Sequence, residues 1–232
     1  MAPPSAIAAK SRTATIPIVF VGGDPVREGL VPTFNRPGGN ITGVYTVFED
    51  VGSKQLALLS ELLPHGKGIA ILTNPTNTNM TVETVERNAL EAGKVIGRQV
   101  DIINARSPDE IEASFERMHS IGAGGVLVSV DPFFLTQAKR LVALASHHRL
   151  PVVFWRREFC DAGGLMCYGA SPREAYVQVG IYTGRVLKGT SPADLPIVQS
   201  TTFELVLNLK TAKALELDVP ATLLARADEV IE

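Results

Sequence analysis

Three apolar runs in this chain end abruptly at a small or polar residue beside a proline. The runs cover residues 16–21, 68–73 and 125–130, and they stop before Gly22-Gly23-Asp24-Pro25, Asn74-Pro75 and Asp131-Pro132. Uninterrupted apolar runs of this length are typical of parallel strands that helices cover on both faces. In open α/β sheets, ligands bind beyond the carboxyl ends of the strands. We therefore expect the functional residues in the loops that follow these runs.

The composition indicates a globular chain with a substantial core. Its 232 residues are 45% hydrophobic, which is enough for one large domain or two small ones. The formal net charge is −2 without a block of like charges, so nucleic acid is not an expected partner. No apolar stretch approaches the roughly 18 residues that cross a bilayer. Residues 1–15 lack the charged and apolar regions of an export signal, so we expect none there.

Strand-like and helix-like segments alternate along the chain, which is typical of βαβ units. The pattern predicts an α/β fold with parallel sheets, and residues 69–154 alone make nearly a complete doubly wound domain. Ser107 and Glu110 fit a capping box at the start of one helix. The expected strands cover residues 16–21, 41–45, 69–73, 99–103, 126–130, 152–154, 165–168 and 203–207.

Cysteine and histidine spacing argues against a metal site. Cys160 and Cys167 could pair across a turn, but two cysteines make no disulfide framework, and we expect free, partly buried thiols. They form no C-x-x-C pair, and no histidine is spaced to complete a metal site with them. We therefore expect neither a metal nor a cofactor.

Several segments resemble, in order and spacing, the ABC-transporter substrate-binding family related to the tryptophan-binding TrpX proteins. The resemblance runs essentially from Pro3 to Glu232, and its specificity comes from the ordered set of segments. No single motif would suffice. The segments that carry it are residues 16–26, 35–44, 131–134, 157–159, 162–166, 203–213 and 225–229.

This resemblance implies a type I periplasmic-binding-protein fold, with two doubly wound lobes joined by three crossovers. We expect a first lobe at 1–47 plus 164–192 and a second at 48–160 plus 201–232. The crossovers are expected near 44–47, 161–164 and 195–200.

Family members normally begin with an export signal and the first strands of the first lobe. The resemblance therefore implies an amino-terminally truncated member with an incomplete first lobe, and a periplasmic location. Such a lobe would expose a sheet edge and an apolar face, and both features lower solubility.

Residues that follow the expected strands are the candidate ligand-binding residues. Carboxylates suit the ammonium group of an amino acid, hydroxyls suit its carboxylate, and aromatic rings supply apolar surface. The implied fold would place Asp24 across a cleft from Asn74 and Asp131. The candidates are Asp24, Asn74, Thr76, Asn77, Asp131, Phe133, Tyr168 and Ser171.

Several of these candidates have structural alternatives that the sequence leaves open. Asp24 and Asp131 also suit helix N-caps or turns. Asn74 and Asn77 suit Asx turns, and Phe133 suits a core.

We predict a solute-binding component of an ABC importer, with no catalytic activity. It would capture a small organic ligand, such as an aromatic amino acid, between two lobes and deliver it to permease subunits at the membrane. One alternative is a doubly wound enzyme that uses Asp24 or Asp131 as acid or base. The chain lacks a G-x-S-x-G elbow, a P-loop and a G-x-G-x-x-G turn, which disfavours that alternative. Another is the ligand-sensing domain of a receptor or repressor.

Overall fold

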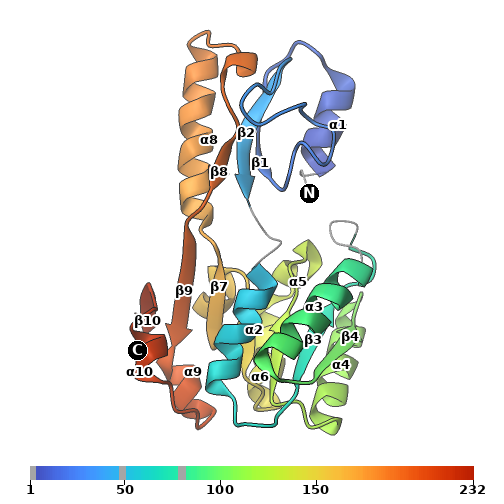
Figure 1. Ribbon diagram of the computed structural model, residues 1–232, viewed down its shortest axis with the longest axis vertical. Coiled ribbons are helices and arrows are strands. Elements are labelled where there is room, and N and C mark those ends of the chain that lie inside the picture. Colours follow the sequence, from blue (N-terminus) through green and yellow to red (C-terminus); the bar gives the residue numbers. More distant parts are fainter. Residues whose placement is uncertain (1–3, 47–50, 78–81) are drawn as a thin grey trace. The chain divides into compact units, whose positions relative to one another are not determined.

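The computed structural model describes residues 4–46, 51–77 and 82–232 of an α/β chain (Figure 1). The strands are β1 (Ile18–Gly22), β2 (Ile41–Thr46), β3 (Ile69–Thr73), β4 (Val100–Asn104), β5 (Gly125–Val128), β6 (Val152–Phe154), β7 (Met166–Ala170), β8 (Val198–Ser200), β9 (Phe203–Asn208) and β10 (Glu229–Ile231). The α-helices are α1 (Pro4–Arg12), α2 (Val51–Leu62), α3 (Val82–Ile96), α4 (Pro108–Ser120), α5 (Pro132–Thr136), α6 (Ala138–His147), α7 (Arg157–Asp161), α8 (Pro172–Leu187), α9 (Leu209–Ala214) and α10 (Ala221–Leu224). A short 3-10 helix covers Pro192–Asp194.

The three apolar runs are strands, as predicted, and each becomes β1, β3 or β5. Every residue of β3 and β5 is buried, because helices cover both faces of their sheet. β5 ends at Val128, and α5 begins at Pro132. Proline suits the first position of a helix, because the backbone N–H there has no partner within the helix.

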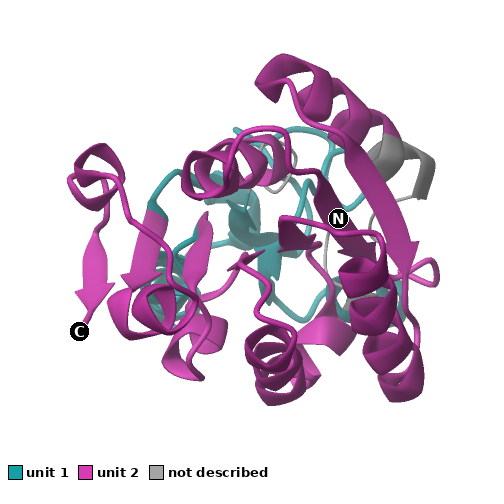
Figure 2. Cartoon of the chain, turned by 90° about the horizontal axis from the view of Figure 1, so that it is seen from below, with its two compact units in different colours: residues 1–48, 170–203 teal, residues 49–169, 204–232 magenta. Residues whose placement is uncertain are grey.

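The chain divides into two compact units, each made of two chain segments (Figure 2). Unit 1 comprises residues 1–48 and 170–203, and unit 2 comprises residues 49–169 and 204–232.

Unit 2 is built on a seven-stranded sheet with the order β10-β9-β7-β6-β5-β3-β4. The five strands from β7 to β4 run parallel, so their carboxyl ends meet at one edge. Asn208 at the end of β9 donates its N–H to the carbonyl of Leu165 before β7, and Ser171 after β7 donates to the carbonyl of Thr202 before β9, so β9 runs antiparallel to β7. Buried side chains of α4 to α7 cover one face, and those of α2, α3, α9 and α10 cover the other.

Unit 1 contains a three-stranded parallel sheet with the order β1-β2-β8. Its core is small, with Phe20 and Ile41 packed against residues of α1, the loop after β1 and the segment before β8. One side of α8 is apolar and exposed, with Tyr176, Val177 and Ile181 each at least half accessible to solvent. The solubility of the chain stays a prediction.

The structure corrects the expected sheet of the strand near 165–168. We expected this strand to return to the first lobe after a crossover at 161–164. Instead, β7 pairs with β6 in the sheet of unit 2, with Met166 opposite Val153, and the chain passes into unit 1 at residues 169–170. The glycines at 163–164 make a turn within unit 2, where Gly163 has a φ of 103°.

The third crossover also differs from its expected position, whereas the first cannot be compared because it reaches residues outside the described chain. β8 pairs with β2 in unit 1, so the third passage lies at residues 203–204 and not near 195–200. The first passage was expected near 44–47. Residues up to Thr46 belong to β2, and residue 47 lies outside the described part of the chain.

The expectation of free thiols is wrong, because Cys160 and Cys167 form a disulfide with their Cα atoms 6.1 Å apart. Cys160 lies in α7 and Cys167 in β7, and the turn at Gly163 reverses the chain between them. The spacing of the two cysteines in the sequence does not show that the chain reverses direction between them. Both residues are at least 98% buried, as sulfur-containing core residues usually are.

Candidate ligand-binding site

The candidate site lies at the edge of unit 2 where β3, β4 and β5 end. The strand registers place Thr73 opposite Asn104 and Leu72 opposite Val128, so the loops after the three strands start at the same level. Adjacent strands lie about 4.8 Å apart, which brings the side chains of neighbouring loops within reach of one another.

Asp131 is the N-cap of α5, as the structural alternative proposed. One of its carboxylate oxygens accepts hydrogen bonds from the backbone N–H groups of Phe133 at 2.7 Å and Phe134 at 3.2 Å. The other oxygen accepts a hydrogen bond from the Asn74 side-chain amide at 3.2 Å. This third bond crosses from the loop after β5 to the loop after β3, so Asp131 joins the two loops.

Asn74 and Thr76 extend this connection to the surface. Asn74 Oδ1 accepts hydrogen bonds from the Thr76 backbone N–H at 3.0 Å and from the Thr76 hydroxyl at 2.8 Å. Asn77 closes the loop from the other side, because its side-chain amide donates to the carbonyl of Val130 at 3.0 Å. Asn74 is buried and Thr76 is exposed, so the network leads from the interior to solvent.

The hydrogen bonds from Thr76 through Asn74 to Asp131 all point in one direction. The Thr76 hydroxyl donates to Asn74, and Asn74 donates to Asp131. Asp131 is only 2% exposed, and among the described residues its hydrogen-bond donors are all neutral. A buried negative charge without a cationic partner makes the surrounding edge attractive to a cation. We call Thr76, Asn74 and Asp131 the Asp131 relay.

Within unit 2, the loops after β3 and β5 bring Asn74, Thr76, Asn77, Asp131 and Phe133 together. Phe133 is half-buried and packs against the core of unit 2, with its ring centroid 5.6 Å from that of Phe134.

Asp24 and Ser171 belong to unit 1. Asp24 closes a turn there by accepting hydrogen bonds from the backbone N–H groups of Val26 at 2.9 Å and Arg27 at 3.0 Å. Ser171 is buried and is the N-cap residue of α8.

Tyr168 lies within β7, and its half-buried side chain packs against the core on the α2 and α9 face of the sheet. Burial raises the pKa of its phenol, and the negative charge of Asp228 adds to the increase. Tyr168 therefore lies within a strand, and not in the loop after a strand as we expected.

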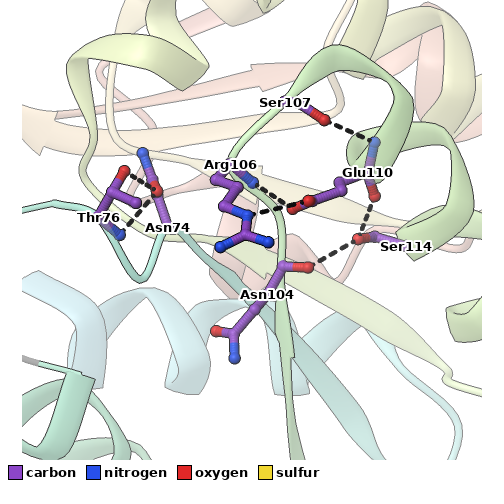
Figure 3. A network of polar contacts seen from close by, with 7 residues as sticks. All are labelled: Asn74, Thr76, Asn104, Arg106, Ser107, Glu110 and Ser114. Carbon is purple, nitrogen blue, oxygen red and sulfur yellow. Dashed lines mark hydrogen bonds and ion pairs between the residues drawn. The ribbon is translucent and has the colours of Figure 1, made fainter.

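Two polar residues at the end of β4 were missing from the predicted set. Asn104 accepts a hydrogen bond from the Thr73 hydroxyl at 2.6 Å. Arg106 follows Asn104 two residues later, and both are drawn in Figure 3. Arg106 donates from Nε to Glu110 at 3.0 Å and from its backbone N–H to the same carboxylate at 2.9 Å. The rule that selected Asn74 and Asp131, a polar residue soon after an expected strand, would also have found Asn104 directly after the strand expected at 99–103 and Arg106 two residues further on. No proline directly follows the strand expected at 99–103, so its end does not share the pattern of the three apolar runs.

The described residues contain no group of three or more His, Cys, Asp or Glu side chains arranged to hold a metal ion. Within the same part of the chain, we find no helix with the length and apolar character needed to span a bilayer.

Comparisons with known proteins agree with the architecture. The family model described as ABC transporter substrate binding protein matches residues 1–231. A tyrosine-binding protein of Clostridioides difficile (strain R20291) is 26% identical over 216 residues, which cover 92% of this chain and 61% of the relative. The chain thus spans less than two thirds of that relative's length.

Solved structures show the same fold. An ABC domain from Streptococcus pneumonia, in complex with L-Trp, superposes with a TM-score of 0.81 at 28% identity, covering 98% of this chain and 78% of the other. A conserved domain protein from Vibrio cholerae has a TM-score of 0.82 at 24% identity, covering 98% of this chain and 75% of the other. The fold is therefore that of the type I periplasmic binding proteins, as the resemblance implied.

Proposed function

The chain belongs to the ABC transporter substrate-binding protein family, and we propose that it binds an amino acid with an aromatic side chain for import through a membrane permease. One relative is named for tyrosine binding, and one structural neighbour was solved with L-Trp. These names give the ligand class that we test first.

The Asp131 relay is the observation that carries this proposal. An ammonium group at the carboxyl edge of unit 2 would donate to the Thr76 oxygen, which has lone pairs to spare. Thr76 already donates to Asn74, and Asn74 donates to Asp131, so each bond in the series would reinforce the next. The negative charge at the buried end favours a cation at the exposed end. A neutral sugar would gain nothing from that charge.

The disulfide supports a location outside the reducing cytosol. Disulfides persist in the periplasm and in extracellular space, where solute-binding proteins capture their ligands. Cys160 and Cys167 are paired, which is consistent with folding in such a compartment.

Isothermal titration calorimetry with L-tyrosine, L-tryptophan, L-phenylalanine, L-leucine and D-ribose tests the proposal. We expect saturable binding of an aromatic amino acid without turnover and no heat from ribose. Asp131→Asn should weaken binding about 10- to 100-fold, since a hydrogen-bonded charge typically contributes about 1.5–3 kcal/mol. Asparagine is as good an N-cap as aspartate, so α5 should keep its start.

Asp109→Asn is the matched control, because it removes an exposed carboxylate from the first turn of α4. It should bind as tightly as the wild type. Thermal unfolding of both variants checks that the fold is retained. Equal affinity of wild type and Asp131→Asn would refute the role of the relay, and turnover of any ligand would refute the transport function. Asp24→Ala and Ser171→Ala in the same titration test the two candidates of unit 1.

A further inference from the structure

Only one nitrogen of the Arg106 guanidinium group, Nε, donates a hydrogen bond to a neighbouring residue that the structure describes. Its Nε donates to Glu110 Oε1 at 3.0 Å, while the other Glu110 oxygen accepts the Arg106 backbone N–H at 2.9 Å. Within the described part of the chain, the two Nη atoms of Arg106 have no hydrogen-bond or ion-pair partner. The outer end of the guanidinium therefore keeps two parallel donors, the arrangement that binds a carboxylate through both oxygens.

The Arg106–Glu110 pair is held in place by the start of α4. Ser107 caps this helix by accepting the Glu110 backbone N–H at 3.2 Å, and Glu110 returns to the backbone of Arg106 (Figure 3). The hydrogen bond from the Arg106 backbone, followed by that from its side chain, lowers the pKa of Glu110 below its ordinary value. Glu110 therefore stays ionised at neutral pH and keeps orienting Nε.

Arg106 lies at the same sheet edge as the Asp131 relay. Thr73 and Asn104 are opposite each other in β3 and β4, and the Ala105 N–H donates to the Thr73 carbonyl at 2.9 Å. The loops that contain Thr76 and Arg106 thus follow adjacent strands, and such strands lie about 4.8 Å apart. The edge presents the relay, with its exposed end at Thr76 after β3 and its charged end at Asp131 after β5, and a cationic group after β4. An α-amino acid carries the complementary pair of charges on one carbon atom.

We propose that Arg106 is the specificity-determining residue that binds the carboxylate of the ligand through Nη1 and Nη2. This inference rests on the proposed function, because it assigns the second charged group of the same ligand. It predicts that the protein selects amino acids over the amines that lack the carboxylate. The opposing explanation is purely structural, with the Arg106–Glu110 pair serving only to stabilise the first turn of α4.

Calorimetry with L-tryptophan and tryptamine, and with L-tyrosine and tyramine, measures this selectivity directly. For the wild type we expect the amino acid to bind about 10- to 100-fold more tightly than its amine, the range for a charge-assisted contact. Arg106→Met should weaken binding of the amino acid by that factor and leave the amine unchanged. Arg106→Lys should recover part of the loss, because lysine keeps the charge without the two parallel donors.

Two variants separate ligand contact from helix stabilisation. Glu110→Gln removes the charge of the pair but keeps an amide oxygen that can accept the Nε hydrogen bond, so the guanidinium should stay oriented and the selectivity for the amino acid should be kept. Arg140→Met removes another exposed arginine that pairs with α4, at 3.0 Å from Glu112, and should behave as the wild type.

Three results would overturn the inference. They are an equal loss of amine and amino acid binding in Arg106→Met, the same loss in Glu110→Gln, and wild-type binding in Arg106→Met. In each case the wild type still binds amino acids, and the proposed function stands. If the wild type binds none of the four compounds, the proposed function fails and takes this inference with it.

Discussion

At the scale of single residues, Gly169 shows how closely the backbone strands of unit 2 approach. A Cβ atom at this position of β7 would lie 2.0 Å from the carbonyl oxygen of Trp155. Trp155 itself is held by packing on Phe159, with ring centroids 4.8 Å apart, and Phe159 stacks on Phe154 at 4.4 Å. The carbonyl belongs to the backbone and cannot turn aside as a flexible side chain would. The position therefore requires glycine.

We predict that Gly169→Ala lowers the free energy of unfolding by at least about 2 kcal/mol, the cost of forcing a group into a filled space. Urea denaturation followed by circular dichroism measures the change. Gly52→Ala in α2 is the control, because a Cβ there meets no atom within 4 Å and alanine favours a helix. A Gly169→Ala protein as stable as the wild type would show that the strands can separate at low cost.

At the scale of elements, β10 is a three-residue edge strand that depends on side chains for its place. It pairs with β9, and Arg157 of α7 binds Glu229 through two hydrogen bonds, Nη1 to Oε2 at 2.5 Å and Nη2 to Oε1 at 2.7 Å. Asp228 adds two bonds to the backbone of Leu205, one from its N–H and one through its carboxylate, at 2.9 and 2.8 Å. So short a strand has few hydrogen bonds to its neighbour, and the ion pair fastens β10 to α7.

This ion pair should make the attachment of β10 depend on pH. The hydrogen bonds from Arg157 lower the pKa of Glu229 below its ordinary value of 4.5 and raise the pKa of Arg157. Because the pKa of the carboxyl is lower in the folded state, its stabilisation is complete above pH 4.5 and is lost as the pH falls through the lowered value.

We therefore predict that Glu229→Gln is less stable than the wild type at pH 7 and that the difference shrinks as the pH falls below 4.5 through the lowered pKa. Urea midpoints at pH 7 and pH 3 measure it. Glu232→Gln, which removes an exposed carboxylate just after β10, should show no difference at either pH. A Glu229→Gln deficit of the same size at pH 3 would mean that packing, and not charge, holds β10.

At the scale of the whole molecule, the chain builds two units with separate cores and passes between them three times. Unit 1 has one small cluster that contains Phe20 and Ile41, whereas unit 2 has a large cluster on each face of its sheet. The Cys160–Cys167 disulfide lies in unit 2, where it ties α7 to β7. Its formation ties the stability of the molecule to the redox state of its surroundings.

We predict that reducing the disulfide lowers the free energy of unfolding by about 2.5 kcal/mol, the chain-entropy value for a loop this short. Urea denaturation with and without dithiothreitol measures the effect. The double variant Cys160→Ala/Cys167→Ala should be less stable than the oxidised wild type and should not respond to the reductant. A wild type whose unfolding transition is indifferent to reduction of both cysteines would contradict this role.

Much of the candidate site could be predicted because the position where a strand ends depends on residues close to it in the sequence. The strand expected at 69–73, before Asn74-Pro75, has the same first and last residues as β3. Asp131 was predicted both as a candidate ligand-binding residue and, alternatively, as an N-cap. The capping box at α4 was half right: Ser107 accepts the Glu110 N–H, but Glu110 bonds the backbone of Arg106 and not that of Ser107. Which of the two adjacent backbone N–H groups the Glu110 side chain binds depends on its rotamer, and the spacing of residues in the sequence does not determine the rotamer.

The sequence by itself determined the α/β class, the strand and helix order and most of the polar loop residues, since each depends on neighbours a few positions away. Tertiary structure decided which sheet accepts β7, how Cys160 meets Cys167, and which of the candidates act together. These outcomes depend on pairing between distant segments, where one hydrogen bond such as that from Asn74 to Asp131 spans 57 residues. Three polar residues in the loops after β3 and β5 became a directed relay only when the parallel register brought the two loops to one edge.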